Sequence, residues 1–357
     1  MESFLQRRMS IDDEYVILDS CFDWSLAESK QRRSEAREYL EVYEEQLRHL
    51  DLEYSRGLGD VWPFAQKSQA HLLKIIDNIR ALGAGATLQQ AICAVQADSR
   101  LIVAHRESLL PVIYAALRIW LLINFRREEV RSGGGNRPCV EWLEGVTIST
   151  ALNSVFRVSS TELTLAQRRL SPHFTAATMV SICGLKIEWA TTLDDHLNLD
   201  RQRKALRIFP CRKWLLLKAE AAAQNEHTGN KISSAPLPAE LYAETSRTLD
   251  LLFPAWDRRT RKLLKAKGKD FHSSYSRNRL LDLKHYPYWK DRLLELNEDI
   301  FLAPPEGFAQ LWNDRRDPQK FWTFWIALAV FILTVASTVA SVLQTWATLR
   351  NPIKAAT

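Results

Sequence analysis

A run of 29 residues without a charged side chain, from Phe321 to Leu349, constrains this chain more than any other feature of its sequence. A helix needs about 20 apolar residues to cross the hydrocarbon core of a bilayer, so this run can cross it with both ends in the interfacial layers. Trp322 and Trp346 lie roughly 36 Å apart at the helical rise, which suits the two interfacial belts. The sequence therefore predicts one transmembrane helix at 321–349, with three interface anchors: Trp322, Trp325 and Trp346.

The position of the span predicts its orientation. The chain starts with MESFLQRRMSIDDEYV, which lacks the basic stretch and apolar run of a signal peptide, and only eight residues follow Leu349. We therefore expect insertion after synthesis, as in tail-anchored proteins, with the N-terminal bulk in the cytosol. Five scattered cysteines and the lack of an Asn-x-Ser/Thr sequon agree with a reducing compartment. The sequence does not indicate which membrane is used.

Small hydroxyl residues recur inside the span at three- and four-residue spacing, which places them on one face of the helix. Such a face is typical of helix–helix contacts in lipid. The alternative, which the sequence favours, is that each hydroxyl bonds to the carbonyl four residues earlier in its own helix. The candidate contact residues are Thr334, Ser337, Thr338, Ser341 and Thr345.

Helical periodicity dominates the N-terminal part of the chain. Leu40, Tyr43 and Leu47 recur with helical spacing, and Thr87 to Gln90 fits a capping box. The apolar run 109–125 contains Arg118, which costs about 2.5–3.5 kcal/mol at the centre of a bilayer, so we expect a core helix rather than a second span. The predicted parts are a loosely ordered N-terminus at 1–24, a helical domain at 25–127 and a loop at 128–138.

The pattern changes after this loop. Leu185, Ile187 and Trp189 alternate as in a half-buried strand, and a second strand is expected at 205–209. With the helix expected at 174–183, this outline predicts a small mixed α+β module, two-stranded and winged-helix-like. The fold class is thus mainly α. The remaining parts are the module at 139–226, a linker at 227–238, a helical, basic juxtamembrane region at 239–320, the transmembrane helix at 321–349 and a short tail at 350–357.

Charge is distributed unevenly along the chain. Residues 257–279 carry 9 Lys/Arg against 2 Asp/Glu, whereas residues 1–60 carry 8 against 15. A basic block near an anchor is suited to anionic lipid headgroups, at about 1 kcal/mol per residue. A solvated helix face is the alternative that the sequence favours over lipid contact, and nucleic acid is disfavoured because only two aromatic residues are interleaved for stacking. The candidate lipid contacts are Arg258, Arg259, Arg261, Lys262, Lys265, Lys267 and Lys269.

The sequence contains no motif for nucleophilic catalysis or nucleotide binding: it has no Gly-x-Ser-x-Gly elbow and no complete P-loop. Asp194, Asp195 and His196 have metal-ligand chemistry, but adjacent residues of a helical turn point in different directions. A metal site would require a further ligand such as His173. An Asp-rich cap with a structural histidine is favoured, so we expect no catalytic, metal or cofactor-binding residue and no cofactor.

Two motifs resemble those of a group of filamentous ascomycete fungal proteins with a Trp-rich single C-terminal transmembrane helix. GLKIEWATTLDDHL at 184–197 matches a mid-chain element through Trp189, Thr192 and His196. The stretch PPEGFAQLWNDRRDP at 304–318 matches the segment that leads into the span. The resemblance covers about the last 220 residues and implies a single C-terminal span. It implies no activity, and no functional residue carries over.

These features favour a non-enzymatic, cytosol-facing interaction or scaffold protein held on a membrane. Its expected partners are the bilayer, anionic headgroups and a protein that the sequence does not identify. One alternative is a membrane-bound enzyme of unrecognised type, with a site near Asp194, Asp195 and His196 in the 139–226 module. A further alternative is a membrane-tethered nucleic-acid binder. The predicted helix at 174–183 carries no Lys or Arg, which disfavours this last alternative.

Overall fold

The structure is a computed structural model of the whole chain. Three predicted parts lie wholly or mostly outside the residues that it describes. They are the loop at 128–138 except residue 138, the centre of the linker at 227–238, and the tail beyond residue 350. The described residues are 10–22, 24–53, 69–98, 109–126, 138–228, 236–269, 271, 279–302 and 318–350.

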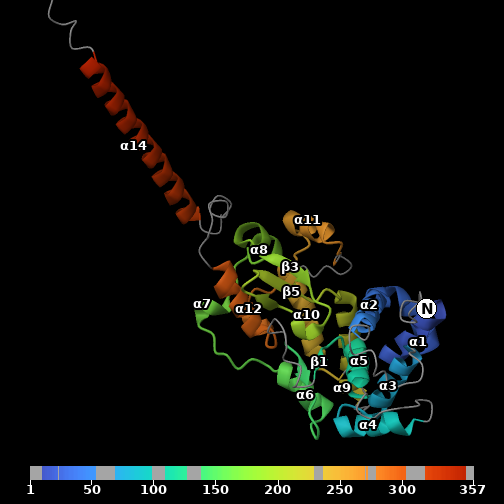
Figure 1. Cartoon of the computed structure of the whole chain (residues 1–357). Coiled ribbons are helices and arrows are strands. Elements are labelled where there is room, and N and C mark those ends of the chain that lie inside the picture. Colours follow the sequence, from blue (N-terminus) through green and yellow to red (C-terminus); the bar gives the residue numbers. More distant parts are fainter. Residues whose placement is uncertain are drawn as a thin grey trace, which may run out of the picture.

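Five helices pack together at the N-terminal end of the body (Figure 1). The start of α4 follows ordinary capping chemistry: the Thr87 hydroxyl accepts from the Gln90 amide, and the Gln90 side chain accepts from the Thr87 amide, so the predicted capping box is confirmed. The apolar run that begins at Leu109 forms a buried core helix, as predicted. The helices are α1 (Ile11–Phe22), α2 (Leu26–Glu53), α3 (Gln69–Leu82), α4 (Leu88–Ala97) and α5 (Leu109–Leu121).

The N-terminus differs from its prediction. Residues 11–22 form the regular helix α1 rather than a loosely ordered segment, and Ile17, Leu18, Cys21 and Phe22 are buried on one side of it. Three of the acidic residues of this stretch, Asp12, Asp13 and Glu14, lie in its first turn, where carboxylates complement the helix dipole.

A three-stranded mixed sheet, in the order β3-β5-β4, lies at the centre of the body. The prediction of two strands was wrong, because Asn198–Asp200 pairs antiparallel with β5 as a third strand. The two predicted strands, β3 and β5, lie side by side and pair in parallel, which differs from the antiparallel hairpin of a wing. The strands are β3 (Lys186–Trp189), β4 (Asn198–Asp200) and β5 (Ala205–Ile208), and a separate parallel pair joins β1 (Phe125–Arg126) to β2 (Val140–Glu141).

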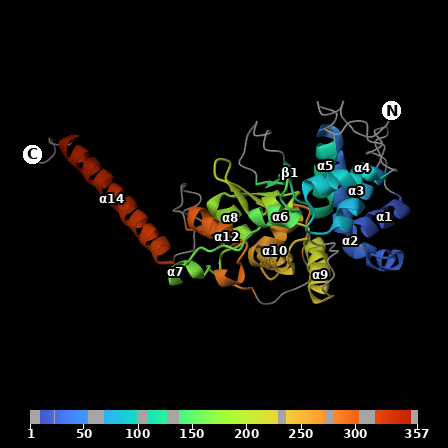
Figure 2. The same ribbon diagram turned by 90° about the horizontal axis from the view of Figure 1, so that it is seen from below.

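Helices flank the sheet in both views (Figures 1 and 2). The expected helix before β3 is present, and Gly184 closes it with a left-handed backbone (φ 69°), which glycine adopts without strain. The helices of this part are α6 (Ile148–Val155), α7 (Leu165–Arg168), α8 (Ala176–Cys183), α9 (Arg212–Thr228), α10 (Ala239–Leu252), α11 (Arg258–Ala266) and α12 (Lys290–Leu296), with the short turns η5 (Leu193–Asp195), η6 (Leu283–His285) and η7 (Asn297–Phe301).

One hydrophobic core runs through the body from Ile17 of α1 to Phe301 of η7. α9 links the two ends, because it packs against α2 on one side and α10 on the other. Trp142 and Trp214 are among the largest fully buried side chains of this core. The predicted domain boundaries stay predictions, since this core is continuous across them.

The last helix, α14 (Pro318–Arg350), projects from the body at the end opposite the N-terminal helices (Figure 2). Within it, Trp322–Thr348 is a stretch of 27 residues with a mean hydropathy of 2.5, and none of it is buried by the rest of the chain. This helix is long and apolar enough to cross a membrane. A core helix would be covered by the body, so the exposure of α14 favours a membrane span over a core helix.

Candidate functional site

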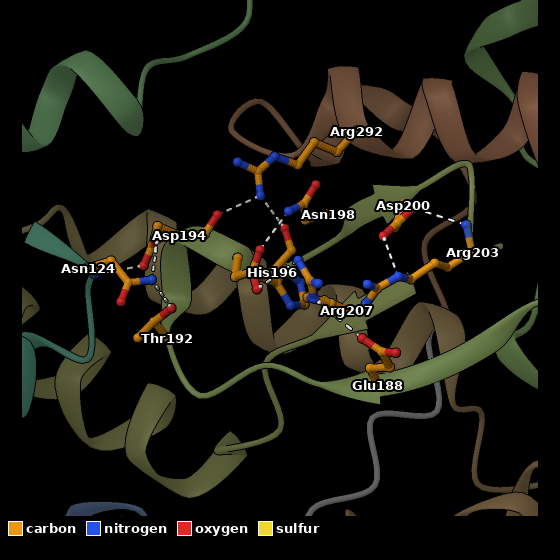
Figure 3. Close-up of polar contacts among 11 residues, drawn as sticks. Asn124, Glu188, Thr192, Asp194, His196, Asn198, Asp200, Arg203, Arg207 and Arg292 are labelled. Carbon is orange, nitrogen blue, oxygen red and sulfur yellow. Dashed lines mark hydrogen bonds and ion pairs between the residues drawn. The ribbon is translucent and has the colours of Figure 1, made fainter. Parts of the chain in front are cut away.

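Asp194 and Asp195 lie on the turn η5 between β3 and β4, and His196 follows it directly. Figure 3 shows the side chains of Asp194 and His196 pointing to different partners. All three are buried, although they are polar. Buried polar groups require hydrogen-bond partners, so the identity of these partners tells whether the turn is a reactive site or a structural joint.

Asp194 joins the sheet to the end of α5. Its carboxylate accepts from the backbone N–H of Asn124 at 3.0 Å and from the Asn124 side-chain amide at 3.0 Å. The same amide also donates to Thr192 Oγ1 at 2.8 Å. Burial raises the pKa of Asp194 to about 6, against the lowering effect of these hydrogen bonds. The carboxylate is thus used to hold the loop after α5.

Asp195 points the other way, towards the sheet. Its Oδ1 accepts from the Asn198 side chain at 2.6 Å, and its Oδ2 lies 3.6 Å from a guanidinium nitrogen of Arg207. Arg207 is shared with Glu188, whose Oε2 lies 3.4 Å from Arg207 Nε. The charge of Asp195 is therefore neutralised by a residue of the neighbouring strand β5.

His196 is fully buried, and both of its ring nitrogens have partners. Nδ1 accepts the backbone N–H of Phe209 at 3.1 Å. Thr248 Oγ1 gives its own proton to the Thr245 carbonyl at 2.6 Å, so Nε2 must donate to Thr248 at 2.7 Å. Burial and then the charge of Arg292 lower the pKa of His196 well below its usual value. A neutral ring with both nitrogens engaged has none left for a metal or a substrate.

Arg292 of α12 fixes the turn from above (Figure 3). One guanidinium nitrogen donates to the Asp194 carbonyl at 2.8 Å and to the His196 carbonyl. The guanidinium also lies 5.0 Å from the ring centroid of Trp289, whose ring packs edge-on against His196 at 4.9 Å. A residue almost one hundred positions away in the sequence thus locks the turn.

These contacts make the turn a structural joint between the end of α5, the sheet and α12. Within the described part of the chain, no group of three His, Cys, Asp or Glu side chains could hold a metal ion. His173, the additional ligand considered in the sequence, is exposed in the turn before α8. The side chains of Asp195 and His196 diverge, which is the arrangement expected of a cap with a structural histidine.

Two cations from other helices cap the C-terminal end of α1. Arg80 of α3 donates to the carbonyls of Asp19 and Ser20 at 3.0 and 2.9 Å, and Lys218 of α9 donates to the carbonyl of Cys21 at 2.7 Å. The last carbonyls of a helix lack internal partners and attract positive charge, and α1 has no basic residue in its own last turn. Lys218 is fully buried, and burial lowers its pKa to about 7.

A buried carboxylate holds the start of α12. Glu244 of α10 accepts from the backbone N–H of Tyr288 at 2.9 and 3.1 Å and from that of Trp289 at 2.7 Å. Burial raises the pKa of Glu244 to about 7, although these hydrogen bonds and the charge of Arg247 oppose the rise. Glu244 thereby attaches the last part of the body before α14.

A polar groove of about 900 Å³ lies on the helical end of the body, between α1, α2 and the start of α9. Several of its cations have partners: Arg33 of α2 contacts Glu14 of α1, Arg37 lies 3.5 Å from Glu41 on the same helix, and Lys30 lies over the ring of Tyr15. The groove is therefore a surface of alternating charge. It is not an apolar groove, which would favour a scaffold role most directly.

The predicted basic residues fall on α11 and its C-terminal end. Six of them are exposed, and within the described part of the chain none of the six has an acidic partner. Lys269 differs, because it is half-buried and its charge acts on Glu38 of α2, where it opposes the rise in that carboxyl's pKa that burial causes. The six exposed cations are Arg258, Arg259, Arg261, Lys262, Lys265 and Lys267.

The hydroxyl groups of α14 form hydrogen bonds within their own helix. Thr334, Thr338, Ser341 and Thr345 each donate to the carbonyl four residues earlier, at 2.8 to 2.9 Å. Such bonds satisfy the hydroxyls without a partner helix. A helix–helix contact at this face, Ser337 included, stays a prediction. Trp322 and Trp346 are exposed near the two ends of the apolar stretch, as interface anchors would be, and Trp325 is half-covered by its own helix.

Sequence reasoning missed several residues that the structure makes important: Asn124, Arg292, Glu244 and Lys218. No local pattern marks them, because their partners lie far away in the chain. Trp256 was also missed, although its position directly before the basic run was visible in the sequence. A scan of family models and searches of curated proteins and of solved structures found no match to this chain.

Proposed function

We propose that this chain is a single-pass membrane protein whose body faces the cytosol and acts as an interaction or scaffold protein. The observation that carries the anchor is the exposed apolar helix α14, which projects from an otherwise well-covered core. An apolar surface of this size is stable in water only if another hydrophobic phase covers it, and its length matches a bilayer.

The interaction role is supported by the state of the buried polar groups. Asp194, His196 and Glu244 are engaged by internal partners, so they are available for structure rather than for a substrate. The groove between α1 and α2 lies at the end of the body away from α14 (Figure 2). A surface held away from the membrane suits a cytosolic protein partner with alternating charges. Kinship with the fungal group named above is part of this proposal and rests on the two sequence motifs at 184–197 and 304–318. Residues 304–317 of the second motif lie outside the described part of the chain.

Truncation after Lys320 tests the anchor. We expect the full chain to resist extraction by alkaline carbonate and the truncated chain to become soluble, because only the former carries α14. In sealed microsomes the body of the full chain should be digested by added protease. A truncated chain that still sediments with membranes would contradict the role of α14, and a protected body would contradict the cytosolic orientation.

Photo-cross-linking from the groove tests the interaction role. A photoreactive residue in place of Arg37, whose side chain is 82% exposed, should give discrete adducts with a protein partner in cells. Arg203, 74% exposed at the sheet end of the body, is the matched control and should give none of the same adducts. Identical adducts at both positions, or none at Arg37, would contradict a partner in the groove.

A further inference from the structure

The helix α11 and the turn before it expose a tryptophan and a cluster of cations on the surface of the body. Trp256, in that turn, is 70% exposed, which is unusual for the largest apolar side chain. It is followed directly by the N-cap Asp257 and then by the six exposed cations of α11. An indole beside a cluster of cations is the composition that favours the interface between water and an anionic bilayer.

α11 is held rigidly with its cations outward. The Asp257 carboxylate accepts from the amides of Arg259 and Thr260 at 3.0 and 3.2 Å. At the other end Gly268 is left-handed (φ 65°), and Lys269 N–H reaches the Leu264 carbonyl at 3.1 Å. Thr260 and Leu264 are buried below, and the helix packs on α8. The cations at 258, 261, 262 and 265 therefore share the opposite face.

The arrangement of charge is unfavourable for the isolated body. Arg258 and Arg259 occupy the first turn of α11, where the helix dipole disfavours cations. Within the described residues none of the six cations forms an ion pair, so the Asp257 carboxylate at the N-cap offsets only part of their mutual repulsion. An external anionic surface would relieve both terms at once.

We propose that α11 and Trp256 form a docking face for the anionic leaflet of the bilayer in which α14 is inserted, with Trp256 entering the headgroup layer and the cations contacting lipid phosphates and carboxylates. This inference rests on the proposed anchor, which brings the bilayer within reach. In the view of Figure 1, α11 lies at the upper edge of the body, and α14 leaves the body towards that same side. The face binds anionic headgroups in general and does not select one particular lipid.

The test uses the full chain reconstituted in vesicles of phosphatidylcholine, with and without phosphatidylserine. Some of the phosphatidylcholine carries a quencher near its headgroup, and Trp256 emission is obtained as the difference between the wild type and Trp256→Phe. We expect quenching of Trp256 and roughly fivefold or greater slowing of amide hydrogen exchange in α11 only with phosphatidylserine, since one cation near an anionic surface is worth about that factor. High salt should abolish both effects.

A matched pair of variants separates docking from net charge. Neutralising one face of α11, with Arg258, Arg261, Lys262 and Lys265 all changed to Gln, should remove the effect of phosphatidylserine. The control makes the same change in charge elsewhere on the surface and should keep the effect. It changes four exposed residues outside the groove to Gln: Arg48, Arg157, Lys186 and Arg203. Equal responses of the two variants would overturn the proposal, as would equal quenching in both lipid mixtures.

The outcomes also separate docking from the anchor and from nucleic acid. If carbonate extracts the chain from the vesicles, the anchor is refuted. If the chain resists carbonate but Trp256 emission is not quenched, only the docking face is refuted. Single-stranded RNA added to the phosphatidylcholine vesicles provides the remaining comparison. If RNA protects α11 more strongly than phosphatidylserine does, the face binds nucleic acid and the proposal is overturned.

Discussion

Replacing Glu244 by alanine should lower the free energy of unfolding by about 3 kcal/mol or more. The change removes the acceptor of the Tyr288 and Trp289 amides, and each buried N–H left without a partner costs about 1–3 kcal/mol. A small cavity adds to the loss. Chemical denaturation of the full chain in detergent micelles, followed by circular dichroism, measures the change.

Glu244→Gln is the matched control. Its amide oxygen can still accept from α12, and it carries no charge, so we expect a change within about 1 kcal/mol at neutral pH. Because the pKa of Glu244 is raised to about 7 in the folded chain, the folded state binds more protons than the unfolded state between pH 4.5 and 7. This residue therefore makes stability fall by up to about 1.4 kcal/mol per pH unit as the pH rises through that window. The glutamine variant should lack this dependence, and equal losses in the Ala and Gln variants would contradict the capping role.

Lys218→Met should remove a pH dependence of the opposite sign. The pKa of Lys218 falls from 10.5 to about 7 in the folded chain, so the unfolded chain binds more protons between pH 7 and 10.5. Stability of the wild type should therefore rise with pH in this window, by up to about 1.4 kcal/mol per unit from this residue. At pH 10 the variant should be the less stable one, because it loses the donor to the Cys21 carbonyl.

Lys213→Met provides the comparison for this experiment, since Lys213 is an exposed lysine on the same helix. Denaturation midpoints of the three chains at several pH values between 7 and 10 give the slopes. The Lys213 variant should keep the wild-type slope. If Lys218→Met keeps it too, Lys218 is not a buried amine beneath α1, and the capping of α1 by cations from other helices is wrong.

The two predictions concern buried helix ends that lack hydrogen-bond partners within the helix: the C-terminal end of α1 and the N-terminal end of α12. α1 ends with buried carbonyls that receive Arg80 and Lys218, and α12 begins with buried amides that receive Glu244. A buried helix end needs a partner, and a charged side chain from another helix provides a strong one. The cost of burying these charges appears as the shifted pKa values.

Local signals in the sequence determined many of the individual elements. The capping box at Thr87 and Gln90, the glycine that ends α8 at Gly184 and the long apolar run of α14 act through neighbouring residues, so no fold is needed to recognise them. The Leu109 helix was also recognised as a core element from its length and its internal arginine. The mainly α fold class follows from these elements.

Tertiary structure alone decided how these elements meet. α1 is a helix because the body buries its apolar face, and Asn198–Asp200 is a strand because β5 offers it hydrogen bonds. Asp194 and Asn124 are 70 positions apart, and Arg292 is 98 positions from the Asp194 carbonyl that it binds. Contacts at such separations leave no period or motif in the sequence, because any polar residue there would look solvated. The sequence by itself therefore determined the long apolar helix α14 and most of the other helices, whereas only packing turned a metal-like Asp-Asp-His turn into a structural joint.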